Sequence, residues 1–362
     1  MIAIIYFLII LSVLVFVHEL GHFLVAKYFD IRVDEFGIGY PPRAKKLFSW
    51  RGTDFTLNWL PFGGFVKIFG ENPSEADNIE VEQVKNSFAS KNRGIQASVL
   101  VSGVVFNFLF AWLLISIGFM SGMPAPLGMN LPITNPKTVI TEVMPGSPAE
   151  IAGLKSGDVI LGVNRENKIS ELDPEKLSNF IGSSKEPINI SIKRGKEEFT
   201  KTINTSEAIV SDRVAIGVAM ETMGSVYLGP SRAIIEGFKV TSDLTLLTAE
   251  SLGVFIKQIF IGHADFSQVT GPVGLVGMVG NVEALGFIYI LSFVALISIN
   301  LSIVNLLPIP ALDGGRLLIV CIEAIRRKNI SPRIFNIANT VSFAFLLLLM
   351  LIITFRDVVK LV

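Results

Sequence analysis

Four long stretches of this sequence contain no charged residue, and they limit the folds open to the chain more than any other feature. They run from Met1 to Val17, from Ala97 to Met120, from Ala284 to Leu312 and from Ile334 to Phe355. A helix needs roughly 20 apolar residues to cross the hydrocarbon core of a bilayer. With 51% hydrophobic and 17% charged residues, the sequence predicts a polytopic α-helical membrane protein with about four transmembrane helices. The third run is long enough to hold a span and a broken segment.

The N-terminal run lacks the basic segment and the small-residue cleavage site of a signal peptide, so we expect a retained span. The formal net charge is zero and indicates no nucleic-acid partner. Cys321 is the only cysteine in the chain, which excludes an intramolecular disulfide framework and a cysteine-based zinc cluster.

Basic residues predict the orientation of the spans. They are frequent over residues 27–93 and around Arg326-Arg327-Lys328, between the third and fourth runs. Because short basic connections stay in the cytoplasm, we expect both segments to be cytoplasmic. The N-terminus and the long region 121–283 then lie on the other side of the membrane.

Directly behind the first run stands the sequence His18-Glu19-Leu20-Gly21-His22. On a helix, HExxH places two imidazoles on one face, where both can bind one Zn²⁺ ion. The glutamate between them, Glu19, can act as general base toward the bound water. Since the preceding run is apolar on every face, this chemistry is predicted to lie inside the bilayer.

A catalytic zinc site needs a third protein ligand and an open position. His263 is the only other histidine, but the predicted orientation puts it on the non-cytoplasmic side, so we interpret it as a structural or surface residue. Asp313 follows Pro308 and Pro310 at the cytoplasmic end of the third run. Broken backbone at membrane depth lines a buried or watery cavity, and an acid there is a functional candidate. Asp313 is also a candidate N-cap for a helix over 314–325, which is compatible with zinc binding.

Residues 128–220 are predicted to form an α/β insert. Alternation predicts strands over 138–143, 157–164 and 188–192, followed by a return strand from Gly195, and helices are predicted after a turn that begins at Pro145 and over 174–181. The stretch from Val143 to Asn164, with Gly146-Ser-Pro-Ala149 and Ala152-Gly-Leu154, resembles a PDZ domain of bacterial proteases. That resemblance implies binding of a peptide or chain end; the alternative is a spacer.

Two further segments are predicted from their patterns. Residues 54–71 alternate between apolar and polar side chains around Gly63-Gly64, which predicts a β-hairpin with its turn at these glycines. Residues 221–283 are predicted to form an amphipathic helical linker and a glycine-rich loop. The helix over 233–261 is expected either on the membrane surface or packed as a surface helix.

Together these motifs resemble the site-2 protease family of intramembrane zinc metalloproteases, and the bacterial regulator-of-sigma-E protease type is the most similar. The resemblance rests on HExxH in the first run, on Asn305-x-x-Pro-x-Pro-x-Leu-Asp313-Gly-Gly in the third run and on the inserted PDZ-like domain. It covers nearly the whole chain. The segment 54–71 resembles the family's membrane-associated β-hairpin, which implies pairing with unwound substrate; the alternative is an ordinary cytoplasmic hairpin. The Gly103-x-x-x-Asn107 element and the stretch 269–274 match further family features, although Val104 stands where the family commonly has proline.

The resemblance implies specific roles. His18, His22 and Asp313 would bind Zn²⁺ and Glu19 would be the catalytic base. Asn305 would hold the substrate or the transition state, with Asn107, Gly63 and Gly64 as further candidates for substrate contact; Asn107 could instead be a polar contact between helices.

The implied partners are the lipid bilayer and single-span membrane proteins, such as anti-sigma factors or signal-peptide remnants. The implied location is the bacterial inner membrane, with the active site toward the cytoplasm and the PDZ-like domain on the periplasmic or extracellular side. The alternative from another class is a non-catalytic membrane scaffold or metal carrier.

Overall fold

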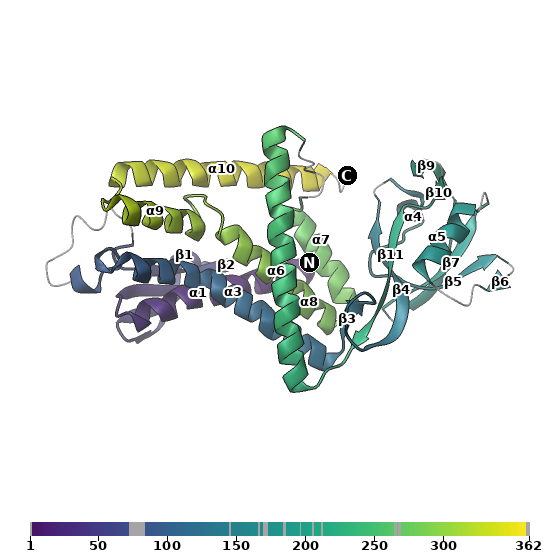
Figure 1. Ribbon diagram of the computed structural model, residues 1–362, viewed down its shortest axis with the longest axis horizontal. Coiled ribbons are helices and arrows are strands. Elements are labelled where there is room, and N and C mark those ends of the chain that lie inside the picture. Colours follow the sequence, from purple (N-terminus) through teal and green to yellow (C-terminus); the bar gives the residue numbers. More distant parts are fainter. Residues whose placement is uncertain are drawn as a thin grey trace. The chain divides into compact units, whose positions relative to one another are not determined.

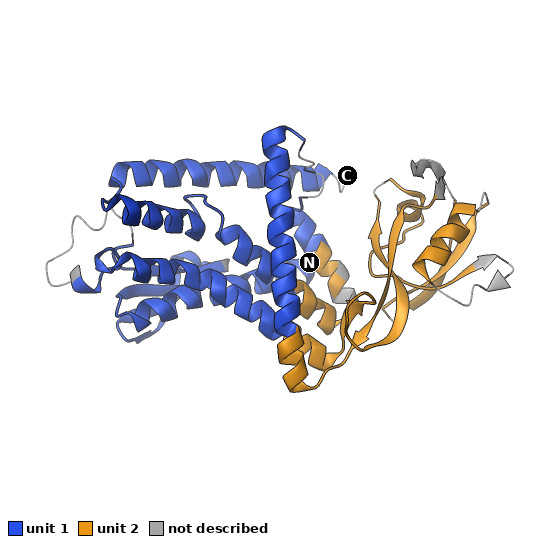
Figure 2. Cartoon of the chain, in the orientation of Figure 1, with its two compact units in different colours: residues 1–114, 237–277, 294–362 blue, residues 115–236, 278–293 orange. Residues whose placement is uncertain are grey.

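The chain divides into two compact units in the computed structural model (Figure 2). Residues 1–114, 237–277 and 294–362 form the first unit, and residues 115–236 and 278–293 form the second. The structure describes residues 2–71, 84–144, 146–165, 167–168, 173–183, 186–195, 197–204, 206–210, 213–263, 266 and 269–359.

Long apolar helices dominate the first unit. In chain order the long helices are α1 (Ile2–Tyr28), α3 (Arg93–Ser121), α6 (Pro230–Ile261), α7 (Pro272–Leu285), α8 (Phe287–Asn305), α9 (Asp313–Arg326) and α10 (Pro332–Val359), as labelled in Figure 1. Two short 3₁₀ turns, Val84–Asn86 and Phe88–Ser90, precede α3. Of these helices, α3, α6, α7 and α8 contribute residues to both units.

Five described helices are long and apolar enough to cross a membrane, judged by length and composition. α1, α3, α8 and α10 contain the four predicted runs. The fifth is α6, which the sequence pattern had suggested as a surface helix. Its most apolar window has a hydropathy of 1.5, against 2.3 to 2.5 for the others, and none of that window is buried. Charged residues interrupt α6, so it does not appear as an uncharged run in the sequence.

The third run contains a span followed by broken backbone, as predicted. α8 ends at Asn305, and α9 begins only at Asp313. Pro308 and Pro310 lie in the non-helical segment between them, because proline lacks the N–H that a helix interior needs. This segment turns the chain from α8 into α9.

The glycine-rich segment before the third run is a helix, α7, and not the predicted loop. The Asp357 carboxylate accepts a hydrogen bond from the backbone N–H of Gly274, 2.9 Å away, in the first turn of α7. An acid at a helix N-terminus satisfies an unpaired N–H and interacts favourably with the helix dipole. The residue that stabilises α7 comes from the end of α10, which the local sequence of α7 does not reveal.

A folded-over hairpin packs beside α1. β1 (Val33–Trp50) and β2 (Thr53–Ile68) are antiparallel and joined by a turn at Arg51 and Gly52, both with positive φ. Both strands bend, so that Phe36 pairs with Phe55 on one side and with Val66 on the other. Residues 64–68 therefore lie at one edge of the sheet, and no other strand pairs with their outer side within the described residues.

The predicted hairpin over 54–71 with a turn at Gly63-Gly64 is wrong. These residues belong to one long strand whose partner lies upstream, and Gly63 (φ 76°) is at the bend of that strand. Alternation marks each strand but does not say which strand pairs with which. The turn at Arg51-Gly52 fixes the pairing.

The hairpin is held to α1 and α3 by a common apolar core. Its buried residues are Phe23, Ala26, Ile31, Val33, Phe36, Ile68, Phe88, Val99, Leu100 and Val320. Phe23 makes edge-to-face contacts with Phe36 and Phe55, with ring centroids 5.5 Å apart in both cases. This packing fixes the strand edge beside the helix that carries HExxH.

The second unit is built around an antiparallel sheet. Its strand order is β3 (Met123–Pro126), β11 (Val218–Val226), β4 (Ile133–Val143), β5 (Val159–Arg165), β7 (Ile188–Arg194) and β8 (Glu197–Ile203), with β6 (Asn167–Lys168) paired to β5. β9 (Ser206–Val210) and β10 (Arg213–Ala215) form a separate pair. The sheet extends beyond the predicted insert 128–220 at both ends, because β3 and β11 pair with each other.

The predicted elements of the insert are present. The strands predicted over 138–143, 157–164 and 188–192 lie within or overlap β4, β5 and β7, and the return strand is β8. The two helices are α4 (Pro148–Ile151) and α5 (Pro174–Ser183); Pro145, where the predicted turn begins, lies outside the described residues. Alternate residues such as Ile188, Ile190 and Ile192 are buried in the core of this unit.

Candidate active site

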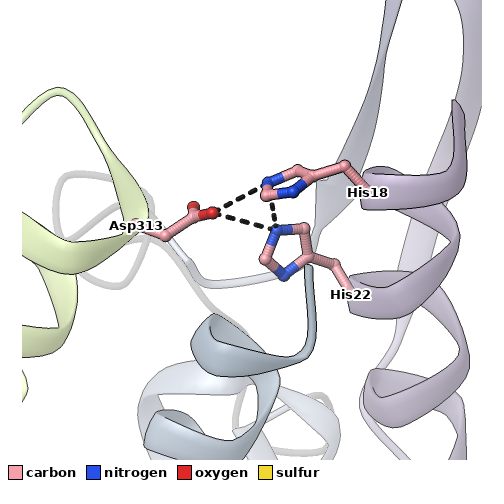
Figure 3. A group of neighbouring side chains, drawn as sticks. All are labelled: His18, His22 and Asp313. Carbon is pink, nitrogen blue, oxygen red and sulfur yellow. Dashed lines mark hydrogen bonds and ion pairs between the residues drawn. The ribbon is translucent and has the colours of Figure 1, made fainter. Parts of the chain in front are cut away.

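Three side chains that could bind one metal ion converge inside the first unit. His18 and His22 project from the same face of α1, and Asp313 faces them from the start of α9 (Figure 3). The Asp313 Oδ2 atom lies 2.8 Å from His18 Nε2 and 3.3 Å from His22 Nε2, and the two Nε2 atoms are 3.1 Å apart. Both imidazoles are 7% exposed.

The residue types and their spacing fit a zinc ion. Ligand atoms arranged tetrahedrally at about 2.0–2.1 Å from zinc lie about 3.3 Å from one another. The three observed separations are close to this value, and two imidazoles with one carboxylate form a ligand set of catalytic zinc sites. Bound by these three residues, a zinc ion would have its fourth position open, as a hydrolytic site requires.

Glycines let the helices approach closely enough to form this cluster. A Cβ atom on Gly103 of α3 would lie 2.4 Å from His22 Nε2 and 2.6 Å from His18 Cε1. A Cβ atom on Gly21 of α1 would lie 2.5 Å from the Ser102 carbonyl oxygen. Contacts this short do not occur, so α1 and α3 can pack at this distance only with glycine at both positions.

Asp313 is positioned by the broken backbone before it and by two glycines after it. A Cβ atom on Gly314 would lie 2.2 Å from the Leu306 carbonyl oxygen, and one on Gly315 would lie 2.1 Å from the Ile309 carbonyl oxygen. The start of α9 therefore packs against the backbone of the segment that follows α8. Asp313 is the first residue of α9 and Leu312 is its N-cap, so the additional N-cap role predicted for Asp313 is wrong. The Asp313 carboxylate turns toward the histidines.

Both imidazoles are also contacted through Nδ1, on the side away from Asp313. His22 Nδ1 lies 2.8 Å from the Val99 carbonyl oxygen, and His18 Nδ1 lies 3.2 Å from the Asn107 amide. Asn107 is fully buried. It lies behind His18 and not at the wall of the cavity described next, unlike a residue that contacts substrate.

A cavity of about 420 Å³ opens beside the cluster. It is lined by Glu19, His22 and Asp313 and by the edge segment 64–68 of β2, whose Val66 backbone lies within hydrogen-bond reach of the Glu19 carboxylate. A polypeptide strand that entered this cavity would lie next to this strand edge and to the carboxylate of Glu19. The sequence predicted the role of Glu19, and the family resemblance implied substrate pairing along residues 54–71. Neither indicated that 64–68 form the edge that lines the site.

Of the other residues predicted from the sequence, some lie at the cluster or its cavity and others do not. Asn305 Nδ2 lies 3.5 Å from His18 Nε2, at the end of α8. Gly64 lines the cavity, whereas Gly63 lies at the bend of β2 and packs against the Tyr40 ring. His263 is exposed just after α6, and the metal-binding cluster found among the described residues does not include it.

Two charged residues at the cavity wall were not singled out from the sequence. Arg316, one helical turn after Asp313, forms an ion pair with Glu71, which follows β2. The same pair lines a second cavity of about 240 Å³, which also contains Arg93 and Glu323. Arg316 could have been found from the sequence, because it stands three residues after Asp313 and therefore on the same face of one helix.

Comparison with known proteins gives matches over nearly the whole chain. A family model described as "Peptidase family M50" matches residues 6–349. A protein of Clostridium perfringens (strain 13 / Type A) named "Putative zinc metalloprotease CPE1693" is 34% identical, over 98% of each chain. Two proteins named "Zinc metalloprotease RasP" are also similar. The one from Geobacillus kaustophilus is 29% identical over 99% of this chain and 98% of its own, and the one from Bacillus licheniformis is 28% identical over 98% of each.

Proposed function

The chain belongs to peptidase family M50, and we propose that this zinc metalloendopeptidase cleaves single-span membrane proteins within their transmembrane segments. The observation that carries the proposal is one cavity within a unit of membrane-length helices. It is lined by Glu19, by two of the metal-ligand candidates and by a strand edge with which no further described strand pairs. The relatives are bacterial proteins, and the chain is accordingly a protein of the bacterial inner membrane.

His18, His22 and Asp313 are the proposed zinc ligands. When bound there, zinc polarises the substrate carbonyl and makes a coordinated water more acidic. The separations of their ligand atoms, 2.8 to 3.3 Å, support this assignment. Since the ligands come from α1 and α9, the site forms only when these two helices pack together.

Glu19 and Asn305 have separate roles in this proposal. The Glu19 carboxylate removes a proton from the attacking water and delivers it to the leaving amide nitrogen. The Asn305 amide donates a hydrogen bond to the carbonyl oxygen as it gains negative charge. Donors of this kind contribute about 3–4 kcal/mol in other enzymes.

The edge segment 64–68 is the proposed support for an unwound substrate. A transmembrane helix pairs its backbone groups internally, so unwinding it in lipid exposes groups that have no water to bond. Pairing of the extended substrate with a strand edge replaces those hydrogen bonds. The edge lines the same cavity as Glu19 and Asp313, where the scissile bond would have to be placed.

The proposal also includes a substrate class and an orientation of the chain in the membrane. Single-span proteins already shortened by another protease, such as anti-sigma factors or signal-peptide remnants, are the proposed substrates. The active site lies toward the cytoplasm, and the β-rich unit lies on the periplasmic or extracellular side, where its PDZ-like part binds a peptide or a chain end. The basic residues between the first two spans and between α9 and α10 support this orientation.

Substitution Glu19→Gln tests the proposal. The purified variant is expected to retain zinc and to lose cleavage of a single-span reporter in liposomes, because the amide cannot accept the proton. Glu250→Gln, an exposed position on α6, is the matched control and should cleave normally. Undiminished cleavage by the Glu19 variant would overturn the assignment, and absence of cleavage by the unsubstituted protein would favour the scaffold or metal-carrier alternative.

A further inference from the structure

The Nδ1 atom of His22 faces a group that can only accept a hydrogen bond. The Val99 carbonyl oxygen lies 2.8 Å away, so Nδ1 carries the proton and Nε2 has a free lone pair. Nε2 is the atom that faces Asp313 and His18. The backbone of α3 thus holds His22 in the tautomer that a metal ligand requires.

His18 has the same requirement but a different partner. Its Nε2 atom faces Asp313, so metal binding through Nε2 needs a proton on Nδ1. The group beside Nδ1 is the Asn107 side-chain amide, whose Nδ2 atom lies 3.2 Å away. An amide can donate through nitrogen or accept through oxygen, and only the oxygen can receive a proton from His18.

The surroundings of Asn107 allow the accepting orientation. The residue is fully buried, and its Oδ1 atom has no hydrogen-bond partner within the part of the chain that the structure describes. A half-turn of the amide places this oxygen on His18 Nδ1. The buried acceptor then gains a partner, and the orientation is decided by His18, whose Nδ1 must carry the proton if Nε2 binds the metal.

We propose that Asn107 is a positioning residue that accepts a hydrogen bond from His18 Nδ1–H and so directs the lone pair of Nε2 toward the zinc ion. This inference rests on the zinc site of the proposed function. It gives the Gly103-x-x-x-Asn107 element one purpose: Gly103 leaves room for both imidazoles, and Asn107, one turn later on α3, orients one of them.

The backbone around Asn107 is fixed independently of its side chain. Ser298 Oγ on α8 donates to the Asn107 carbonyl oxygen at 2.8 Å, and Ser302 Oγ donates to the Val104 carbonyl oxygen at 2.9 Å. These bonds hold α3 against α8. Because they involve only the backbone of α3, they allow its packing to be disturbed without removal of the amide.

Zinc retention tests the proposal in protein that also carries Glu19→Gln, so that no variant cleaves itself or a substrate. Asn107→Leu has a side chain of similar size without polar atoms. In competition with a chelator, the affinity of this variant for zinc is expected to be about 10- to 100-fold weaker than that of the parent. Asn107→Asp can accept but not donate, and it should retain zinc nearly as the parent does. Ser298→Ala is the packing control and should retain zinc unchanged.

Three results would overturn the proposal. One is equal retention by the Leu variant and the parent, because the amide would then be dispensable. Another is equal loss in the Asp and Leu variants, which would mean that Asn107 donates. The third is equal loss in the Ser298 control, which would mean that packing alone explains the effect.

A tautomer measurement separates this proposal from the zinc assignment itself. The chain has only three histidines, so nitrogen NMR of histidine-labelled protein resolves each ring. The His18 Nδ1 atom should be protonated in the parent, with or without metal, and should lose that preference in the Leu variant. A parent that binds no zinc would overturn the metal site, while the His18 tautomer would still decide the role of Asn107.

Discussion

Asp313 Oδ2 lies 2.8 Å from His18 Nε2, although 295 positions separate the two residues. The histidine belongs to α1 and the aspartate to the first turn of α9, and neither helix can form the cluster alone. A metal ion bound by both residues would link α1, the first helix of the chain, to α9. Zinc binding and the packing of these helices are therefore expected to stabilise each other.

Removal of the carboxylate charge at position 313 should release the metal. Asp313→Asn keeps the size of the side chain but replaces an anionic ligand, and we expect zinc affinity to fall by at least about 100-fold, the upper end of what loss of a supporting contact costs. Metal analysis after dialysis against a chelator measures this. Asp243→Asn, exposed on α6, should change nothing; zinc retention by the Asp313 variant would refute the ligand assignment.

A single methyl group on α3 should disrupt the site. In Gly103→Ala the new Cβ would lie 2.4 Å from His22 Nε2, so the imidazoles or α3 must move. Forced packing of this kind costs about 1–3 kcal/mol, and we expect zinc retention and cleavage to fall together. Gly94→Ala, on the same helix with its nearest neighbour 3.4 Å away, is the control and should keep both properties.

The ion pair between Glu71 and Arg316 should couple the end of β2 to α9. The two side chains are 19% and 24% exposed, so solvent screens the pair only in part. In a double-mutant cycle with Glu71→Gln and Arg316→Gln, we expect a coupling of about 1–2 kcal/mol in the free energy of unfolding in detergent. Strictly additive effects would mean that the pair does not hold the cavity wall together.

The second unit depends on a buried carboxylate. Arg194 contacts both oxygens of Asp158, at 2.6 and 2.7 Å, and the Asp158 side chain is 1% exposed. Arg194→Ala leaves that charge unpaired and should destabilise the unit by about 3 kcal/mol. Limited proteolysis of the full-length protein measures this, because cleavage within the sheet should accelerate.

The neighbouring residue supplies the control for this experiment. Lys193 pairs with Glu198 at the surface, where the side chains are 38% and 59% exposed. Lys193→Ala should cost less than about 1 kcal/mol and leave proteolysis unchanged. Equal acceleration in both variants would show that burial of Asp158 does not matter.

The proposed orientation can be measured with introduced cysteines. After Cys321→Ser the chain has no cysteine, and Lys45→Cys and Lys155→Cys each place one at an exposed position. A membrane-impermeant maleimide applied to spheroplasts should label position 155, in the β-rich unit, and leave position 45 unlabelled until the membrane is opened. The reverse pattern would invert the topology.

Elements that depend on local sequence patterns could be predicted before the fold was known. Uncharged runs gave α1, α3, α8 and α10, because burial in lipid requires apolar residues along the whole helix. Alternation gave most strands of the second unit, and Pro308 and Pro310 marked the break before Asp313. HExxH brought His18 and His22 together because residues four apart share a helix face.

Features that depend on contacts between distant segments became visible in the folded chain. The tertiary structure paired β2 with β1 and so exposed the edge 64–68, and it placed Asn107 behind His18. It also showed why glycine stands at positions 21, 103, 314 and 315, where a Cβ atom would collide with a segment far away in the chain or with backbone before α9. A sequence pattern records what a residue needs from its own helix or strand, whereas close packing is a property of two surfaces, and only the folded chain contains both.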